Sequence, residues 1–218
     1  MIYLYAVTDR AGAPLPKRHG LAGAELCEAS RRGLAAVYSA HDALQAEPTP
    51  DVLWTHEAVV EDLMRERTVL PMQFGTRLPD VEALGEMLGQ RGDEFTRVLD
   101  GVRGRVELGV RIAGPGADPT PDPPATGSEY MAKRLGARRE AERIAAAVHT
   151  PLARLAERST TRQDPRGGDL MTGSYLLADD AVGRFTDELK ELQQMHPELA
   201  LTCTGPWPPY SFVEERQG

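Results

Sequence analysis

The side chains best suited to catalysis or metal binding are the five histidines and the carboxylates near them. His56 and Glu57 are adjacent at the expected start of a helix, where they could form half of an acid–base pair. A helix N-terminus also stabilises an acidic side chain, so a structural role for Glu57 and a structural or capping role for His56 is the simpler interpretation. No two histidines are four residues apart, and none lies in an HExxH or CxxC frame. The histidines therefore predict no metal site.

The motifs that position a nucleophile or a phosphate are missing from the sequence. No serine lies in a GxSxG turn, and the glycines match neither GxGxxG nor a phosphate-binding loop. Cys27 and Cys203 are far apart in sequence and predict two reduced, buried thiols. We therefore predict no catalytic residue and no cofactor, and we expect that the protein is not an enzyme.

Two local features stand out as candidates for recognition. Residues 70–76, LPMQFGT, place a proline, Phe74 and Gly75 at the exit of a strand, which indicates a specific turn. Residues 205–212, GPWPPYSF, contain three prolines, which prevent further helix or strand formation. Trp207 and Tyr210 are costly to leave in water. This C-terminal tail (residues 205–218) either folds back over the adjoining sheet or presents a stiff aromatic ligand to a partner, and the first is the simpler interpretation.

The second half of the chain has a regular order of predicted elements. Residues 105–112 alternate between apolar and polar side chains, which is typical of a half-buried strand. The order that follows is strand, helix, strand, strand, helix, strand, with the later elements at residues 128–155, 159–163, 170–178, 182–192 and 199–203. This order predicts a ferredoxin-like βαββαβ domain with two helices on one face of an antiparallel sheet. We place it at residues 103–218, with a proline-rich loop at residues 114–127 that we expect to be mobile.

The first half predicts a separate α+β domain at residues 1–102. Strands are expected at residues 2–7 and 69–74, and a hairpin at residues 25–39. Apolar side chains recur at helical spacing around residues 59–64 and again after Asp80, a plausible cap. Together these elements predict a small mixed sheet with helices, so the whole chain is α+β with two domains.

The net charge of −8 makes nucleic acid and anionic lipid unfavourable partners. No apolar stretch approaches the roughly 18 residues needed to cross a bilayer. The sequence therefore predicts a soluble, cytoplasmic protein that binds neither nucleic acid nor membrane.

Motifs along nearly the whole chain resemble the gas vesicle protein GvpL/GvpF family. The tail motif is the most specific of them, and the opening motif alone would be weak. The matching segments are residues 1–6 (MIYLYA), 33–39 (GLAAVYS), 56–60 (HEAVV), 70–76 (LPMQFGT), 99–107 (LDGVRGRVE), 127–131 (GSEYM) and 204–212 (TGPWPPYSF).

The resemblance implies a two-domain α+β fold, the second domain a modified ferredoxin-like one. It also implies an accessory or minor structural role in gas vesicle assembly, with the small hydrophobic shell protein and other vesicle accessory proteins as partners. An apolar, aggregation-prone shell subunit would need such a soluble partner before assembly. The residues we expect at the binding surface are those of the N-terminal strand edge, the turn after residue 73 and the tail: Tyr3, Tyr5, Phe74, Gly75, Trp207 and Tyr210.

Two other classes of function stay open at this point. A small enzyme or ligand-binding protein would place His56, Glu57 or Glu107 in a deep polar pocket with shifted pKa values. An RNA-binding sheet would need exposed aromatic side chains on its central strands, and the alternating strand offers Arg105 and Arg111 but no aromatic pair.

Overall fold

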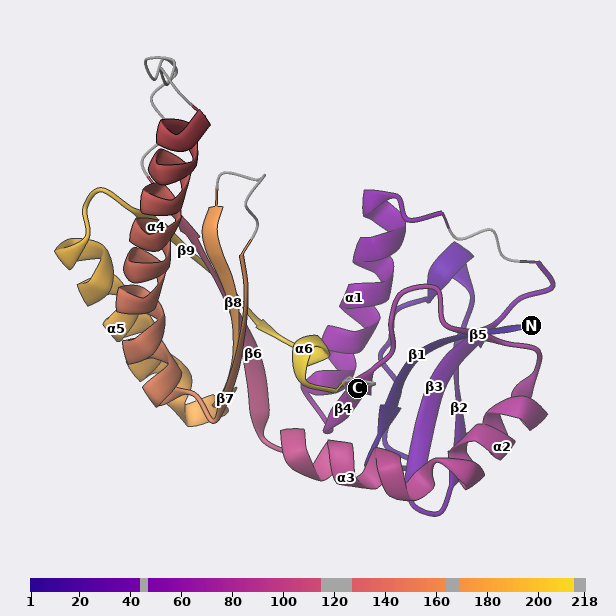
Figure 1. The fold of residues 1–218 in the computed structure, drawn as a ribbon. Helices are drawn as coiled ribbons and strands as arrows, with labels where there is room; N and C mark the ends of the chain where they lie inside the picture. Colours follow the sequence, from indigo (N-terminus) through magenta and orange to yellow (C-terminus); the bar gives the residue numbers. More distant parts are fainter. Residues whose placement is uncertain (44–46, 115–126, 164–168, 214–218) are drawn as a thin grey trace. The chain divides into compact units, whose positions relative to one another are not determined.

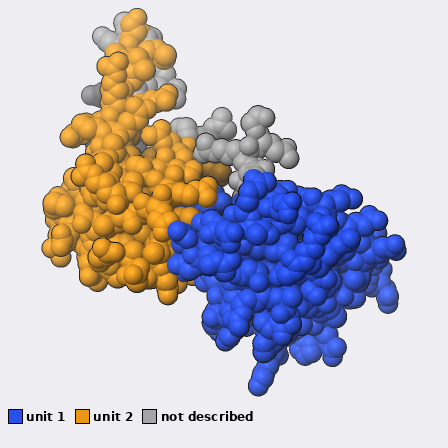
Figure 2. Space-filling model, turned by 90° about the horizontal axis from the view of Figure 1, so that it is seen from below, with its two compact units in different colours: residues 1–106, 207–218 blue, residues 107–206 orange. Residues whose placement is uncertain are grey.

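The computed structural model describes residues 1–43, 47–114, 127–163 and 169–213, and the chain forms two compact units. The first unit comprises Met1–Val106 and the segment from Trp207 onward, and the second comprises Glu107–Pro206 (Figures 1 and 2). The tail from Trp207 was expected to belong with the second half of the chain, and it clusters with the first unit instead. The boundary lies at residue 106 rather than 102 because β6 (Arg105–Ala113) runs from one unit into the other.

The first unit is built on a five-stranded sheet with the order β2-β3-β1-β4, and β5 also pairs with β1. The second and third strands form the predicted hairpin, with residues in register from Leu26 opposite Ser39 to Arg31 opposite Leu34. The elements of this unit are β1 (Ile2–Thr8), β2 (Leu26–Arg31), β3 (Leu34–Ala40), α1 (Pro50–Met64), β4 (Val69–Pro71), β5 (Arg77–Leu78), α2 (Val81–Gln90), α3 (Gly92–Val102) and α6 (Tyr210–Val213).

Helices cover both faces of this sheet, which explains why every residue of β1 is buried. Leu4 packs in a core formed with α2 and α3, whereas Tyr3 and Tyr5 pack in a second core formed with α1. The register of β1 against β3 shifts between Leu4 and Ala6, so one extra residue is accommodated at Tyr5. A bulge of this kind places two consecutive side chains of a strand on the same face of the sheet, whereas the alternation of a regular strand would place them on opposite faces.

The strand pairings correct the expectation of a mixed sheet. All pairings in the sheet of the first unit are antiparallel. The strands β3 and β4 are both antiparallel to β1, which lies between them, so α1 connects two parallel strands that are not neighbours. Pro71 ends the edge strand β4, which is a position where its missing N–H costs no sheet hydrogen bond.

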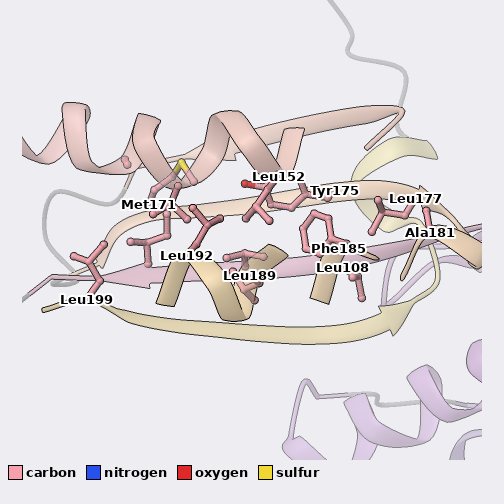
Figure 3. Close-up of a cluster of buried hydrophobic side chains, with 14 residues drawn as sticks. Leu108, Leu152, Met171, Tyr175, Leu177, Ala181, Phe185, Leu189, Leu192 and Leu199 are labelled. Carbon is pink, nitrogen blue, oxygen red and sulfur yellow. The ribbon is translucent and has the colours of Figure 1, made fainter. Parts of the chain in front are cut away.

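The second unit has the strand order β7-β8-β6-β9, which is the order of the predicted ferredoxin-like arrangement. Both helices lie on one face of the sheet, where Leu108, Leu152 and Phe185 contribute to a continuous apolar core (Figures 1 and 3). Besides β6, the elements are α4 (Gly127–Leu155), β7 (Arg158–Arg162), β8 (Asp169–Ala178), α5 (Val182–Met195) and β9 (Ala200–Trp207). The expected proline-rich loop and the tip of the β7–β8 hairpin lie largely outside the described residues.

Three local expectations about helix ends and breaks can be checked. The Asp80 side chain accepts a hydrogen bond from the Ala83 N–H and caps α2 as predicted. Pro151 lies inside α4 without splitting it, because the helix continues to Leu155. Asp179 starts a short 3₁₀ turn ahead of α5, and α5 itself has no side-chain cap.

Candidate functional site

All six residues expected at a binding surface are in the first unit, but they are not equally exposed. Tyr3 and Tyr5 are fully buried, because β1 lies inside the sheet and not at its edge. This corrects the expectation of an exposed N-terminal strand edge. Phe74 and Tyr210 are half-buried, and Gly75 is exposed.

His56 is the centre of this cluster, and both of its ring nitrogens are hydrogen-bonded. Nε2 lies 3.1 Å from the carbonyl oxygen of Met72, which can only accept, so Nε2 carries the proton. Nδ1 is then the acceptor for the Tyr3 hydroxyl at 2.9 Å, and that hydroxyl in turn accepts from the Gly75 N–H at 3.0 Å. Burial lowers the pKa of His56 to about 4, although the Met72 carbonyl favours the charged form. His56 is therefore a neutral residue that connects α1 to the turn after β4.

Aromatic rings surround His56 on several sides. The Tyr5 ring stacks on the imidazole with a centroid distance of 5.6 Å and an interplanar angle of 29°. Phe74 packs edge-on against both the imidazole, at 5.8 Å, and the Tyr3 ring, at 6.1 Å. These geometries are the favourable offset and edge-to-face arrangements of aromatic pairs. Phe74 thereby closes the cluster.

The Tyr5 hydroxyl makes a second set of buried hydrogen bonds. It accepts from the Leu21 N–H at 2.8 Å and lies 2.9 Å from the Ser39 Oγ. The Ser39 Oγ is 2.8 Å from Nε2 of His41, so the chain of hydrogen bonds ends at a half-buried imidazole. Gly20 leaves room for this hydroxyl, because a Cβ at residue 20 would overlap it. The second tyrosine thus anchors the loop between β1 and β2.

The segment after β4 forms the specific turn that the sequence predicted. Thr76 donates from its N–H to the Gln73 carbonyl at 3.1 Å, and its hydroxyl bonds the same oxygen at 2.7 Å. Gly75 has φ +90°, a conformation that favours glycine. The turn therefore needs glycine for its backbone, and it places Phe74 on the aromatic cluster.

The tail packs on the rest of the chain, which is the simpler of the two interpretations of its sequence, but it packs on the first unit. Phe212 is 5% exposed, and Val213 contacts the core formed with α2 and α3. The sheet of the second unit was the expected location. Trp207, whose packing there was expected, is half-buried and starts the segment that belongs to the first unit.

Tyr210 brings the tail close to α1. Its hydroxyl has no partner with hydrogen-bond geometry among the described residues, but the Glu57 carboxyl is close enough to interact with it. Burial is the main cause that raises the pKa of Glu57, and the neighbouring Glu61 raises it further, while Tyr210 opposes the shift. Burial also raises the pKa of Tyr210 well above its usual value, with Glu57 as the next cause. The Glu57 carboxyl and the Tyr210 hydroxyl therefore both lie where little water reaches them.

The cluster is not arranged for catalysis. Both His56 nitrogens are hydrogen-bonded, and the low pKa of this histidine leaves it uncharged at neutral pH.

No group of three histidine, cysteine or acidic residues in the described parts of the chain could hold a metal ion. The half-buried Cys203 thiol has its pKa raised by burial, which makes it less reactive. None of the helices among the described residues is both long and apolar enough to cross a membrane.

One exposed aromatic residue was missed by the sequence analysis. Trp54 of α1 has 62% of its surface exposed, and the adjacent Leu53 is 37% exposed. The signal was available, because His56, Val59, Val60 and Leu63 define the buried face of α1 at helical spacing. Residue 54 lies opposite that face.

The chain was compared with known protein families, curated proteins and solved structures. Residues 1–214 match the family model described as gas vesicle synthesis protein GvpL/GvpF. Gas vesicle protein L of a Streptomyces species is 31% identical, over 97% of this chain and 92% of its own length. Gas vesicle protein F1 of Halobacterium salinarum is 29% identical, over 98% and 92%.

Two crystal structures share the fold at low sequence identity. The gas vesicle protein GvpF of Microcystis aeruginosa matches with a TM-score of 0.81 at 16% identity, over 98% of this chain and 99% of the other. GvpF of Anabaena matches with the same TM-score at 17% identity, over 99% and 97%. The similarity therefore includes both units of the chain.

Proposed function

Because this chain belongs to the GvpL/GvpF family of gas vesicle synthesis proteins, we propose that it serves gas vesicle assembly as an accessory or minor structural protein that binds other proteins. Its main partner in this proposal is the small hydrophobic shell protein, and its other partners are vesicle accessory proteins. The match over residues 1–214 is the observation that carries the proposal.

A non-catalytic role is supported by the chemistry of His56, the histidine that the sequence singled out beside Glu57. An enzyme would need His56 to exchange a proton with a substrate, but its Nδ1 and Nε2 are bonded to Tyr3 and to the Met72 carbonyl. The side chain is only 1% exposed, so no substrate reaches it. The pair thus favours a structural role.

The shell-binding role requires a surface that stays available in the folded chain. Tyr3 and Tyr5 do not provide one, since both rings are buried. Of the residues that the sequence singled out, Phe74, Gly75, Trp207 and Tyr210 keep part of their surface in contact with solvent, and they stay candidates for partner contact.

The proposal is tested by co-expressing the tagged full-length chain with the shell protein and measuring the shell protein that co-purifies. The control is an unrelated tagged protein of similar negative charge, which accounts for non-specific binding of an aggregation-prone subunit. Specific capture is expected. If the folded chain captures neither the shell protein nor another vesicle protein, the binding role is wrong.

A further inference from the structure

The outer face of α1 combines an exposed aromatic ring with carboxylates. Trp54, Glu57, Ala58 and Glu61 share one side of the helix, because residues 57 and 58 lie three and four positions after Trp54 and Glu61 lies four and three positions after them. The buried residues of α1, from His56 to Leu63, occupy the opposite side. We call the four residues of this side the Trp54 face. Trp54 is the largest side chain of this face, and 62% of its surface is open to solvent.

The segment that contains α1 carries mainly negative charge. Residues 42–64 contain six acidic side chains and neither lysine nor arginine, and these are Asp42, Glu47, Asp51, Glu57, Glu61 and Asp62. Asp62 forms ion pairs with Arg18 and Arg65. By contrast, neither Glu57 nor Glu61 takes part in an ion pair within the described parts of the chain. Two carboxylates four residues apart repel each other, so the Trp54 face carries unfavourable like-charge energy until a cation arrives.

We infer that the Trp54 face docks an amphipathic segment of a partner protein that carries lysine or arginine beside apolar side chains. The inference rests on the proposed protein-binding function and names the surface and the chemistry of the occupant. The indole would bury its exposed ring against the apolar side chains of the segment and accept a cation over its face. The carboxylates of Glu57 and Glu61 would pair with the remaining cations and relieve their mutual repulsion.

Several features of the site favour this occupant over others. Nucleic acid and anionic lipid carry phosphates, which the two glutamates would repel. An acidic peptide is excluded for the same reason. Glu57 is half-buried, so its carboxyl is already partly dehydrated and an incoming cation has less water to displace there.

The first experiment measures the surface directly with the full-length protein. The probe is a leucine–lysine peptide of about four helical turns, and the same peptide with glutamate in place of lysine is the charge control. Tryptophan emission should shift to shorter wavelength with the lysine peptide only. Because the chain has two tryptophans, the shift is assigned to Trp54 by its loss in W54F, a variant at an exposed position.

Two variants separate the Trp54 face from general charge attraction. Glu57→Gln with Glu61→Gln should weaken binding of the lysine peptide about tenfold. Met195→Ala is the matched control, because Met195 is as exposed as Trp54 but lies in the other unit, and it should bind the peptide as the wild type does. No emission shift, or equal binding by the glutamine variant, overturns the inference.

The second experiment distinguishes failure of this inference from failure of the proposed function. Capture of the co-expressed shell protein is compared for the wild type, Trp54→Ala and Met195→Ala. A loss of about 30-fold in affinity for Trp54→Ala alone supports both proposals, since a tryptophan that becomes buried in an interface is a typical binding hot spot. Capture that is undiminished in Trp54→Ala overturns the Trp54 face and leaves the assembly role standing. If the wild type captures no vesicle protein but the peptide binds the Trp54 face, the assembly role fails and the surface assignment is supported.

Discussion

Protonation of His56 should destabilise the first unit as the pH falls. The pKa of this histidine drops from its ordinary value of 6.5 to about 4 in the folded chain. The unfolded chain therefore binds the proton more tightly than the folded one, and stability is lost between pH 6.5 and pH 4. Each pKa unit is worth about 1.4 kcal/mol, so the free energy of unfolding should fall by about 2 kcal/mol between pH 7 and pH 5 from this residue alone.

Urea denaturation followed by tryptophan fluorescence is the appropriate assay. Both tryptophans, Trp54 and Trp207, belong to the first unit, so their emission reports on its unfolding. Other groups also titrate: burial lowers the pKa of His41, which acts in the same direction, and raises that of Glu57, which acts in the opposite one. The change is therefore measured as the difference between the wild type and His56→Gln at the two pH values.

The His56→Gln variant should be less stable than the wild type at pH 7 because one residue of the aromatic cluster is replaced. Its loss of stability between pH 7 and pH 5 should nevertheless be smaller by about 2 kcal/mol. His149→Gln is the control, because burial also lowers the pKa of that histidine but it lies in the second unit. If the wild type and His56→Gln lose the same stability over this interval, the buried neutral histidine is not the pH-sensitive group and the reasoning is wrong.

Three further substitutions, one of them with a matched control, test the packing of the first unit by the same assay. Phe212→Ala should cost about 3 kcal/mol, because the ring is 5% exposed, and an unchanged midpoint would show that the tail does not pack. Gly20→Ala should cost about 1–3 kcal/mol by displacing the Tyr5 hydroxyl, whereas Gly85→Ala, with open space around it inside α2, should be neutral or stabilising. Arg67→Lys should cost about 2 kcal/mol and speed proteolysis of residues 10–14, since lysine does not reproduce the hydrogen bonds from the guanidinium group to the carbonyls of this segment. A variant that resists proteolysis as well as the wild type would contradict this.

The second unit could be predicted from the sequence because its elements have clear periodicity. The alternation over residues 105–112 is a strong strand signal, and β6 confirms it. A hairpin and two helices in the remaining order leave few arrangements other than the ferredoxin-like one. Only the pairing of β7 with β8 is local, and the position of β6 between β8 and β9 follows from the ferredoxin-like order itself.

The first unit could be predicted only in part because its decisive contacts are distant in sequence. The apolar run that forms β1 indicated a strand but did not indicate which strands lie beside it. The position of α6 depends on contacts with β4 and α3, more than 100 residues earlier in the chain, which no local pattern reveals. The structural role predicted for His56 agrees with the hydrogen bonds that both of its ring nitrogens make. Trp54 was missed because the apolar stripe was read only for its buried face.

The tail also determines when the first unit can be completed during synthesis. The second unit is encoded between residue 106 and the tail, so the ribosome releases all of it before Phe212 emerges. Until then the core formed with α2 and α3 lacks the side chains that the tail supplies. Domains generally fold as units in the order in which they leave the ribosome. Here most of the first unit is translated before the second, but its apolar core is completed only when the tail is translated, so a nascent chain that stalls before the tail exposes an unfinished core to chaperones and proteases.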